Sequence, residues 1–135
     1  MDGQQKTIAQ TCKDGAESNT MTFPEIVRKL MEAGFESYLV DFRKRTATYY
    51  LSTDESFELP THETASPVAA ALDVVALGAA IREAQILLPG YTYLGFCAKA
   101  KAAGCAGYFV SFSGRRAVYF ARTGETHVEY FPGSR

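Results

Sequence analysis

The chain lacks most of the features that assign a protein to a class at first reading. No apolar run is long enough to span a bilayer, because the longest apolar-leaning stretch, 69–80, is interrupted by Asp73. The first residues contain no apolar segment of the secretory type. We therefore expect a cytoplasmic protein without a membrane segment.

Charge excess and ligand-bearing motifs are also absent. With 14 basic and 15 acidic residues the net charge is −1, so nothing suggests a nucleic-acid partner. The three cysteines, Cys12, Cys97 and Cys105, follow no metal-ligand spacing, and Cys97 and Cys105 are interpreted as small buried side chains. Phosphate loops, dinucleotide fingerprints and nucleophile elbows are missing. The sequence therefore predicts no metal, no cofactor and reduced thiols.

What the chain does contain is an internal repeat at an offset of 70 residues. Twelve identities fall between 22–58 and 92–128, where average residue usage gives roughly two or three by chance. In the first copy these positions are Thr22, Lys29, Ala33, Gly34, Tyr38, Val40, Phe42, Arg45, Ala47, Tyr49, Thr53 and Glu55. The pattern predicts an internal duplication.

Each copy has the pattern of a helix followed by three strands. Thr22 is a predicted N-cap, with Pro24 in the first turn and Glu25 three residues after the cap. Gly34 is expected to end the helix, because glycine adopts the left-handed conformation of a C-cap at no steric cost. Beyond Gly34 the apolar period changes from 3.6 to 2, which indicates strands.

We predict one α+β domain over 1–135. It consists of an N-terminal helix and linker (1–21), repeat 1 (22–60), a connecting loop and helix (61–91) and repeat 2 (92–132). Two three-stranded units would join most simply into one antiparallel sheet of about six strands, with helices mainly on one face.

The two faces of this sheet are expected to differ. Tyr38, Val40 and Phe42 share a strand face that the helices should cover. The opposite face, which includes Leu39 and Phe109, is too apolar to lie bare in water. We considered three covers for it: a helix beginning near Thr7, a ligand, or a second copy of the chain. A homodimer is favoured.

The groove between the repeats is the predicted binding site, because residues of both copies converge at such a junction. Asp41 is the most informative difference between the copies, because a serine, Ser111, occupies the same position in repeat 2. Either a salt bridge or a contact with a ligand would account for an aspartate at this position. His127 lies between carboxylates at 125 and 129, which indicates a solvated cross-strand pair, a base of raised pKa, or part of a metal site with Cys97 or Cys105. The candidate ligand-binding residues are Tyr38, Asp41, Arg45, Tyr49, His62, Arg115, Tyr119 and His127.

Several short motifs resemble one known family. They are Thr22-x-Pro-Glu-x-Val, Tyr38-x-x-Asp, Ala47-Thr-Tyr-Tyr, Ala80-Ile-Arg-x-x-Gln, Gly114-Arg-x-Ala-x-Tyr and Glu125-x-His-Val-Glu. Together they are similar to the YdfO-like family of small bacterial and prophage-associated proteins, a domain of unknown function. The resemblance covers 22–132 and implies a cytoplasmic α+β domain of mobile-element origin. It implies no catalytic residues.

These observations lead to two functional hypotheses. The first is a non-enzymatic module that binds a small molecule or a protein partner in the groove between the repeats; the family resemblance adds a prophage-encoded modulator of a host process. The alternative is a small enzyme that uses Asp41, His62 or His127 in acid–base chemistry. A closed pocket that joins two of these residues would favour the enzyme.

Overall fold

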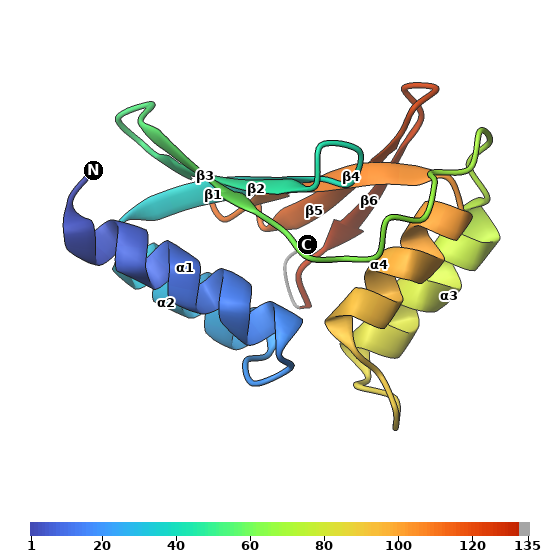
Figure 1. Cartoon of the computed structure of the whole chain (residues 1–135), viewed down its shortest axis with the longest axis horizontal. Coiled ribbons are helices and arrows are strands. Elements are labelled where there is room, and N and C mark those ends of the chain that lie inside the picture. Colours follow the sequence, from blue (N-terminus) through green and yellow to red (C-terminus); the bar gives the residue numbers. More distant parts are fainter. Residues whose placement is uncertain (133–135) are drawn as a thin grey trace.

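The computed structural model describes residues 1–132, in which four helices lie on one side of a six-stranded antiparallel sheet (Figure 1). The helices are α1 (Gly3–Glu17), α2 (Phe23–Glu32), α3 (Val74–Gln85) and α4 (Tyr93–Ala102). The strands are β1 (Phe35–Asp41), β2 (Thr46–Leu51), β3 (Ser56–Pro60), β4 (Cys105–Ser111), β5 (Arg116–Ala121) and β6 (Thr126–Tyr130). The predicted fold class is confirmed.

The strand order is β3-β2-β1-β4-β5-β6, so β1 and β4 meet at the centre of the sheet. Leu39 pairs with Phe109, which is the same position 70 residues later, and the register runs symmetrically outward from this pair. The hairpins agree with this symmetry, because Phe35 pairs with Leu51 just as Cys105 pairs with Ala121. The strand registers thus repeat at the offset on which the duplication was inferred.

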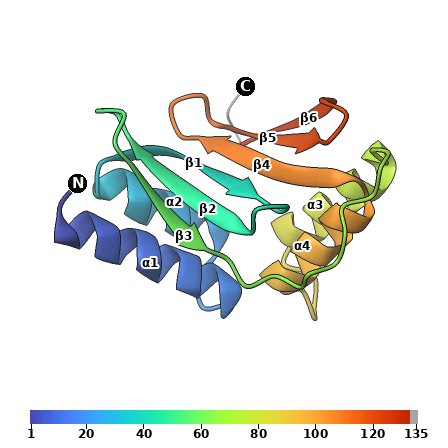
Figure 2. The ribbon, with the colours of Figure 1, turned by 45° about the horizontal axis from the view of Figure 1, so that its top comes forward.

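The helices form two pairs, α1 with α2 and α3 with α4, and both pairs lie under the same face of the sheet (Figure 2). The predicted capping box of α2 is present, with the Thr22 amide donating to Glu25 Oε1 at 2.8 Å. The first helix begins at Gly3, earlier than predicted, because Asp2 and Gln5 form a second capping box. No helix within residues 1–132 is long and apolar enough to cross a membrane.

The position of α1 corrects one expectation. We considered α1 as a cover for the sheet face that carries Leu39, but α1 packs beside α2 under the other face. Its buried residues Ala9 and Cys12 belong to the same core cluster as Tyr38 and Tyr49. No helix within residues 1–132 therefore lies over the face with Leu39, which we call the outer face (Figure 2).

Residues 61–73, here called the strap, carry the chain from β3 across to the α3–α4 pair (Figure 1). The Ala69 amide donates to the Lys101 carbonyl at 3.0 Å, and the Asp73 amide donates to the Ala103 carbonyl at 2.7 Å. The Lys101 side chain is fully buried and its ammonium donates to the Thr64 carbonyl. These contacts fix the strap along α4, next to the boundary between the two helix pairs, which we call the seam.

Candidate functional site

Four tyrosines form the floor of the seam. Tyr38 and Tyr49 pair across β1 and β2, with ring centroids 5.5 Å apart, and Tyr108 and Tyr119 pair across β4 and β5 at 5.4 Å. Tyr38 and Tyr108 meet edge to face at 6.2 Å, where the two halves join. All four point toward the helices because strand side chains alternate between faces. The predicted site residues Tyr38, Tyr49 and Tyr119 thus lie in one row.

A cavity of about 60 Å³ opens at this row. Its walls come from α1 and α2, its floor from β1 and β2, and its far side from Tyr93 of α4 and Tyr108 of β4. A single water needs about 10–15 Å³ of such volume, so the cavity holds a few waters or one group of side-chain size. Pockets that enclose a drug-sized ligand measure about 300–1,000 Å³, so this one is too small for such a molecule.

Two buried side-chain oxygens of the strap, one of them at the cavity, are without a hydrogen-bond partner among the described residues. Thr61 is 7% exposed, lines the cavity, and its Oγ1 has no partner within 1–132. The buried carboxylate oxygen Oε1 of Glu63, two residues later in the strap, is also unpartnered in that part of the chain. Buried polar atoms are nearly always paired, so these two indicate that something else meets this part of the strap.

The phenols around the cavity are neutral. Burial raises the pKa of Tyr38, Tyr49, Tyr93 and Tyr108 well above the ordinary tyrosine value, because a phenolate is poorly solvated away from water. Each hydroxyl can therefore donate and accept a hydrogen bond across the physiological range. The floor of the seam is aromatic and polar without carrying charge.

Two contacts hold the start of α4 in place at the cavity. The hydroxyls of Tyr93 and Tyr108 lie 2.7 Å apart, and the amide of Tyr93 donates to Asn19 Oδ1 at 2.8 Å. Asn19 belongs to the turn between α1 and α2, whereas Tyr93 is the first residue of α4. The start of α4 is therefore bound both to the sheet and to the other helix pair, and this sets the width of the seam.

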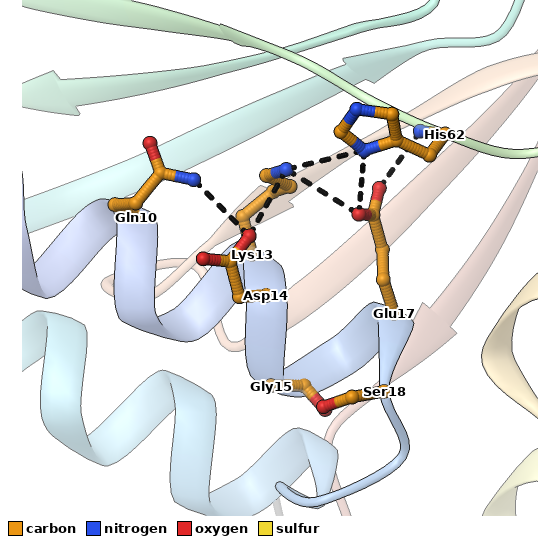
Figure 3. Close-up of polar contacts among 7 residues, drawn as sticks. All are labelled: Gln10, Lys13, Asp14, Gly15, Glu17, Ser18 and His62. Carbon is orange, nitrogen blue, oxygen red and sulfur yellow. Dashed lines mark hydrogen bonds and ion pairs between the residues drawn. The ribbon is translucent and has the colours of Figure 1, made fainter.

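A charged cluster, drawn in Figure 3, lies at the rim of the cavity, whose lining includes Lys13 and Glu17. The ammonium of Lys13, 6% exposed, lies 3.1 Å from Asp14 Oδ1 and 3.3 Å from Glu17 Oε1. Glu17 in turn accepts from the backbone amide of His62 at 2.8 Å and lies 2.9 Å from its Nδ1. The same Nδ1 lies 3.4 Å from the Lys13 ammonium, so one ring nitrogen of His62 faces both a carboxylate and an ammonium.

The rim cluster contains one cationic and two anionic side chains. The hydrogen bond that Asp14 accepts from Lys13 is the main reason that the pKa of Asp14 lies below the ordinary aspartate value. One ammonium thus faces two carboxylates, with His62 exposed above them. Sequence reasoning identified His62 but missed Lys13 and Glu17, although their four-residue spacing with opposite charge was visible on the predicted helix.

Asp41 does not reach this site. Its Oδ1 accepts from the amides of Arg43 and Lys44 at 3.0 and 3.1 Å, which closes the turn after β1. Ser111 does the same in the second half, where its Oγ accepts from the Gly114 amide at 2.9 Å. The substitution between the copies therefore preserves a turn cap, and Asp41 acts as a structural residue.

The remaining candidates lie outside the cavity lining. Arg45 has a φ of 57° and donates to the Glu63 carbonyl at 2.8 Å, and Arg115 occupies the equivalent turn position with a φ of 51°. His127 Nε2 lies 2.7 Å from Glu129 Oε2, and its ring packs 6.4 Å from Tyr119. The structure thus gathers Tyr38, Tyr49 and His62 at the cavity. It leaves Arg45, Arg115 and His127 outside.

The acid–base pair of the enzyme hypothesis is not formed. Asp41, His62 and His127 have different partners: turn amides, Glu17 and Glu129, respectively. Within 1–132 no group of three or more histidine, cysteine or acidic residues is placed to hold a metal ion.

The cysteines make a first testable prediction. All three are buried, and burial raises the thiol pKa to about 11 for Cys12 and Cys105 and to about 12 for Cys97. Because only the thiolate reacts, we expect none to be alkylated by iodoacetamide at pH 8 in the native protein and all three in denaturant, as read by mass spectrometry. Rapid alkylation of the native protein would contradict this prediction.

The raised thiol pKa values also predict a pH dependence of stability. The free energy of unfolding should fall as the pH rises from about 9, because the thiols of the unfolded chain ionise first.

Comparison with known proteins adds no assignment. No protein-family model matches the chain, and no curated protein is significantly similar to it. The functional conclusion below therefore depends on the geometry of the seam.

Proposed function

We propose that this protein is a non-enzymatic binding module, and that its seam cavity receives an uncharged, hydrogen-bonding group of side-chain size. The observation that carries the proposal is the unpartnered Thr61 hydroxyl at the cavity wall. A buried hydroxyl without a partner costs about 1–3 kcal/mol, and ligand binding would recover this cost.

The chemistry around Thr61 determines the class of ligand. The nearby phenols are neutral, and Tyr49 lines the cavity together with Thr61. Lys13 is already paired with Asp14 and Glu17, and Glu63 lies outside the cavity lining, so no unpaired charge faces the cavity. An amide or alcohol group, presented by a small molecule or by a side chain of a protein partner, meets these donors and acceptors best.

The cavity volume favours a group at the end of a larger partner over a whole metabolite. A peptide side chain such as asparagine, glutamine or serine has the required size and polarity. With the YdfO-like resemblance, the proposal extends to a cytoplasmic modulator that binds a host protein.

The test combines fragment binding with a matched pair of variants. Uncharged amides and alcohols, amines and carboxylates are screened by two-dimensional NMR, and shifts are expected for the uncharged set at seam residues. Thr61→Val should weaken binding at least tenfold, about 1.4 kcal/mol, by removing one hydrogen bond. The control Thr48→Val changes a partly exposed threonine of the outer face and should leave binding unchanged.

Stability provides a second readout of the same variants. Without ligand, Thr61→Val should raise the free energy of unfolding by about 1 kcal/mol, because it removes an unpaired buried hydroxyl. A loss of stability instead would show that the hydroxyl already has a structural partner such as a bound water.

Tyr49→Phe, compared with Tyr50→Phe on the outer face, repeats the binding test at a second position. Equal affinities for all four variants would refute the proposal.

A further inference from the structure

The outer face of the sheet is a second surface without a partner in the structure, on the side opposite the seam. Its central row crosses all six strands in register as Glu58, Thr48, Leu39, Phe109, Val118 and Val128. The aromatic residues Tyr50, Phe120 and Tyr130 lie in neighbouring rows. Leu39, Phe109 and Val118 are partly exposed, and Val128 is 37% exposed. Such an apolar sheet face normally packs against another layer.

The charged side chains of this face are divided between the two halves. Glu58 on β3 and Asp41 on β1 are acidic, whereas Arg116 on β5 is basic and stacks on Tyr130, 4.7 Å from its ring centroid. The equivalent of Glu58 in the second half is Val128. Glu58 also lies 3.5 Å from the ammonium of Lys44, in the turn after β1. One half of the outer face therefore carries the two carboxylates, and the other carries Arg116 and is more apolar.

This division selects one way to stack two copies face to face. A two-fold axis parallel to the strands places β3 of one copy over β6 of its partner, so Glu58 faces Val128 of the partner subunit. Arg116 of the partner subunit then lies over β2, the strand next to Glu58, and two residues along it. Its long side chain can reach Glu58 from there. A two-fold axis across the strands would instead place Glu58 over the partner's Glu58, which is unfavourable.

The area of the face is sufficient for a specific dimer. Six strands spaced about 4.8 Å apart, each about five residues long at about 3.3 Å per residue, give roughly 500 Å² per copy. Two copies bury roughly 1,000 Å², which is the threshold for a specific interface. This is the area of a flat sheet, and the side chains that project from it add to the buried area. The axis passes between Leu39 and Phe109, so Leu39 would pack on Phe109 of the partner subunit.

We propose that a second copy of this chain covers the outer face, with the two sheets stacked around a two-fold axis parallel to the strands. The four repeats then surround Leu39 and Phe109 in an arrangement close to 222 symmetry. Both seam cavities remain open on the outside of the dimer. The dimer is therefore independent of the proposed ligand site, and each proposal can fail without the other.

The test is the mass of the full chain in solution, measured by sedimentation equilibrium from about 1 to about 200 µM. We expect twice the chain mass of 14.8 kDa at the upper concentrations. Val128→Glu should raise the dimer Kd at least tenfold. The control Val75→Glu introduces the same charge on the exposed side of α3 and should leave Kd unchanged.

A charge exchange tests the orientation without removing apolar contacts. Glu58→Arg and Arg116→Glu should each weaken the dimer at least threefold, and the double variant should return Kd to within twofold of the wild type. Thermal unfolding checks that each variant remains folded. A monomer throughout the concentration range overturns the proposal, as does a dimer that tolerates Val128→Glu. Single charge variants that strengthen the dimer, or a double variant weaker than both singles, overturn the proposed axis.

Discussion

Gly104→Ala is expected to lower the free energy of unfolding by at least about 3 kcal/mol, or to prevent folding, which places it in the exceptional range for one substitution. Gly104 follows α4 with a φ of 89°, a conformation that costs a residue with a Cβ about 1–2 kcal/mol. A Cβ at this position would also lie 2.1 Å from the Ala71 carbonyl oxygen and 2.9 Å from the Leu72 Cα. Both are backbone atoms, so no side-chain rotation relieves the clash.

The matched control is Gly34→Ala at the equivalent position after α2. Gly34 has a φ of 99°, but its added Cβ would meet only the flexible Gln5 amide at 3.4 Å. We therefore expect a loss of about 1–2 kcal/mol from the backbone alone. Urea unfolding followed by circular dichroism measures both variants. Equal losses would show that the strap moves away from Gly104 without cost, and would contradict the close approach.

The two glycines also show how far the sequence leads. Their role as helix ends followed from the pattern before and after them, and the structure confirms it through their positive φ values. The close approach of the strap to Gly104 had no signal, because no periodicity marks the path of an irregular segment. Local conformation was therefore predictable, whereas the difference between the two halves was not.

The candidate site divides in the same way. The shared strand face of Tyr38 and Tyr49 followed from alternation, and the structure places both at the cavity. The Lys13–Glu17–His62 cluster depends on where the segment after β3 meets α1, residues 45 to 49 positions apart in the chain. Asp41 drew attention as a difference between copies, yet Ser111 performs the same turn function. A change of residue type was therefore a poor guide to a change of role.

The second large effect is expected at Leu30 and Ala100, which occupy the same repeat position on α2 and α4 and are both fully buried. Leu30→Ala leaves a cavity under α2 and should cost about 2–5 kcal/mol. Ala100→Leu forces extra volume between α4 and the sheet and should cost about 1–3 kcal/mol. Met31→Ala and Ala102→Leu, at exposed positions of the same helices, are the matched controls and should change stability little.

Ala100→Leu is the more informative of the two, because it tests why α4 carries small residues. The strap binds the C-terminal end of α4 through Lys101 and Ala103, and Tyr93 binds its start to Asn19 and Tyr108, so the helix cannot move outward to admit a leucine. The double variant Leu30→Ala/Ala100→Leu should lose free energy of unfolding equal to about the sum of the two single losses, because the two sites lie in different halves. If instead Ala100→Leu is neutral in urea unfolding, α4 is free to shift. The large penalty at Gly104 and the fixed width of the seam would then both have to be abandoned, because all three depend on α4 being held at both ends.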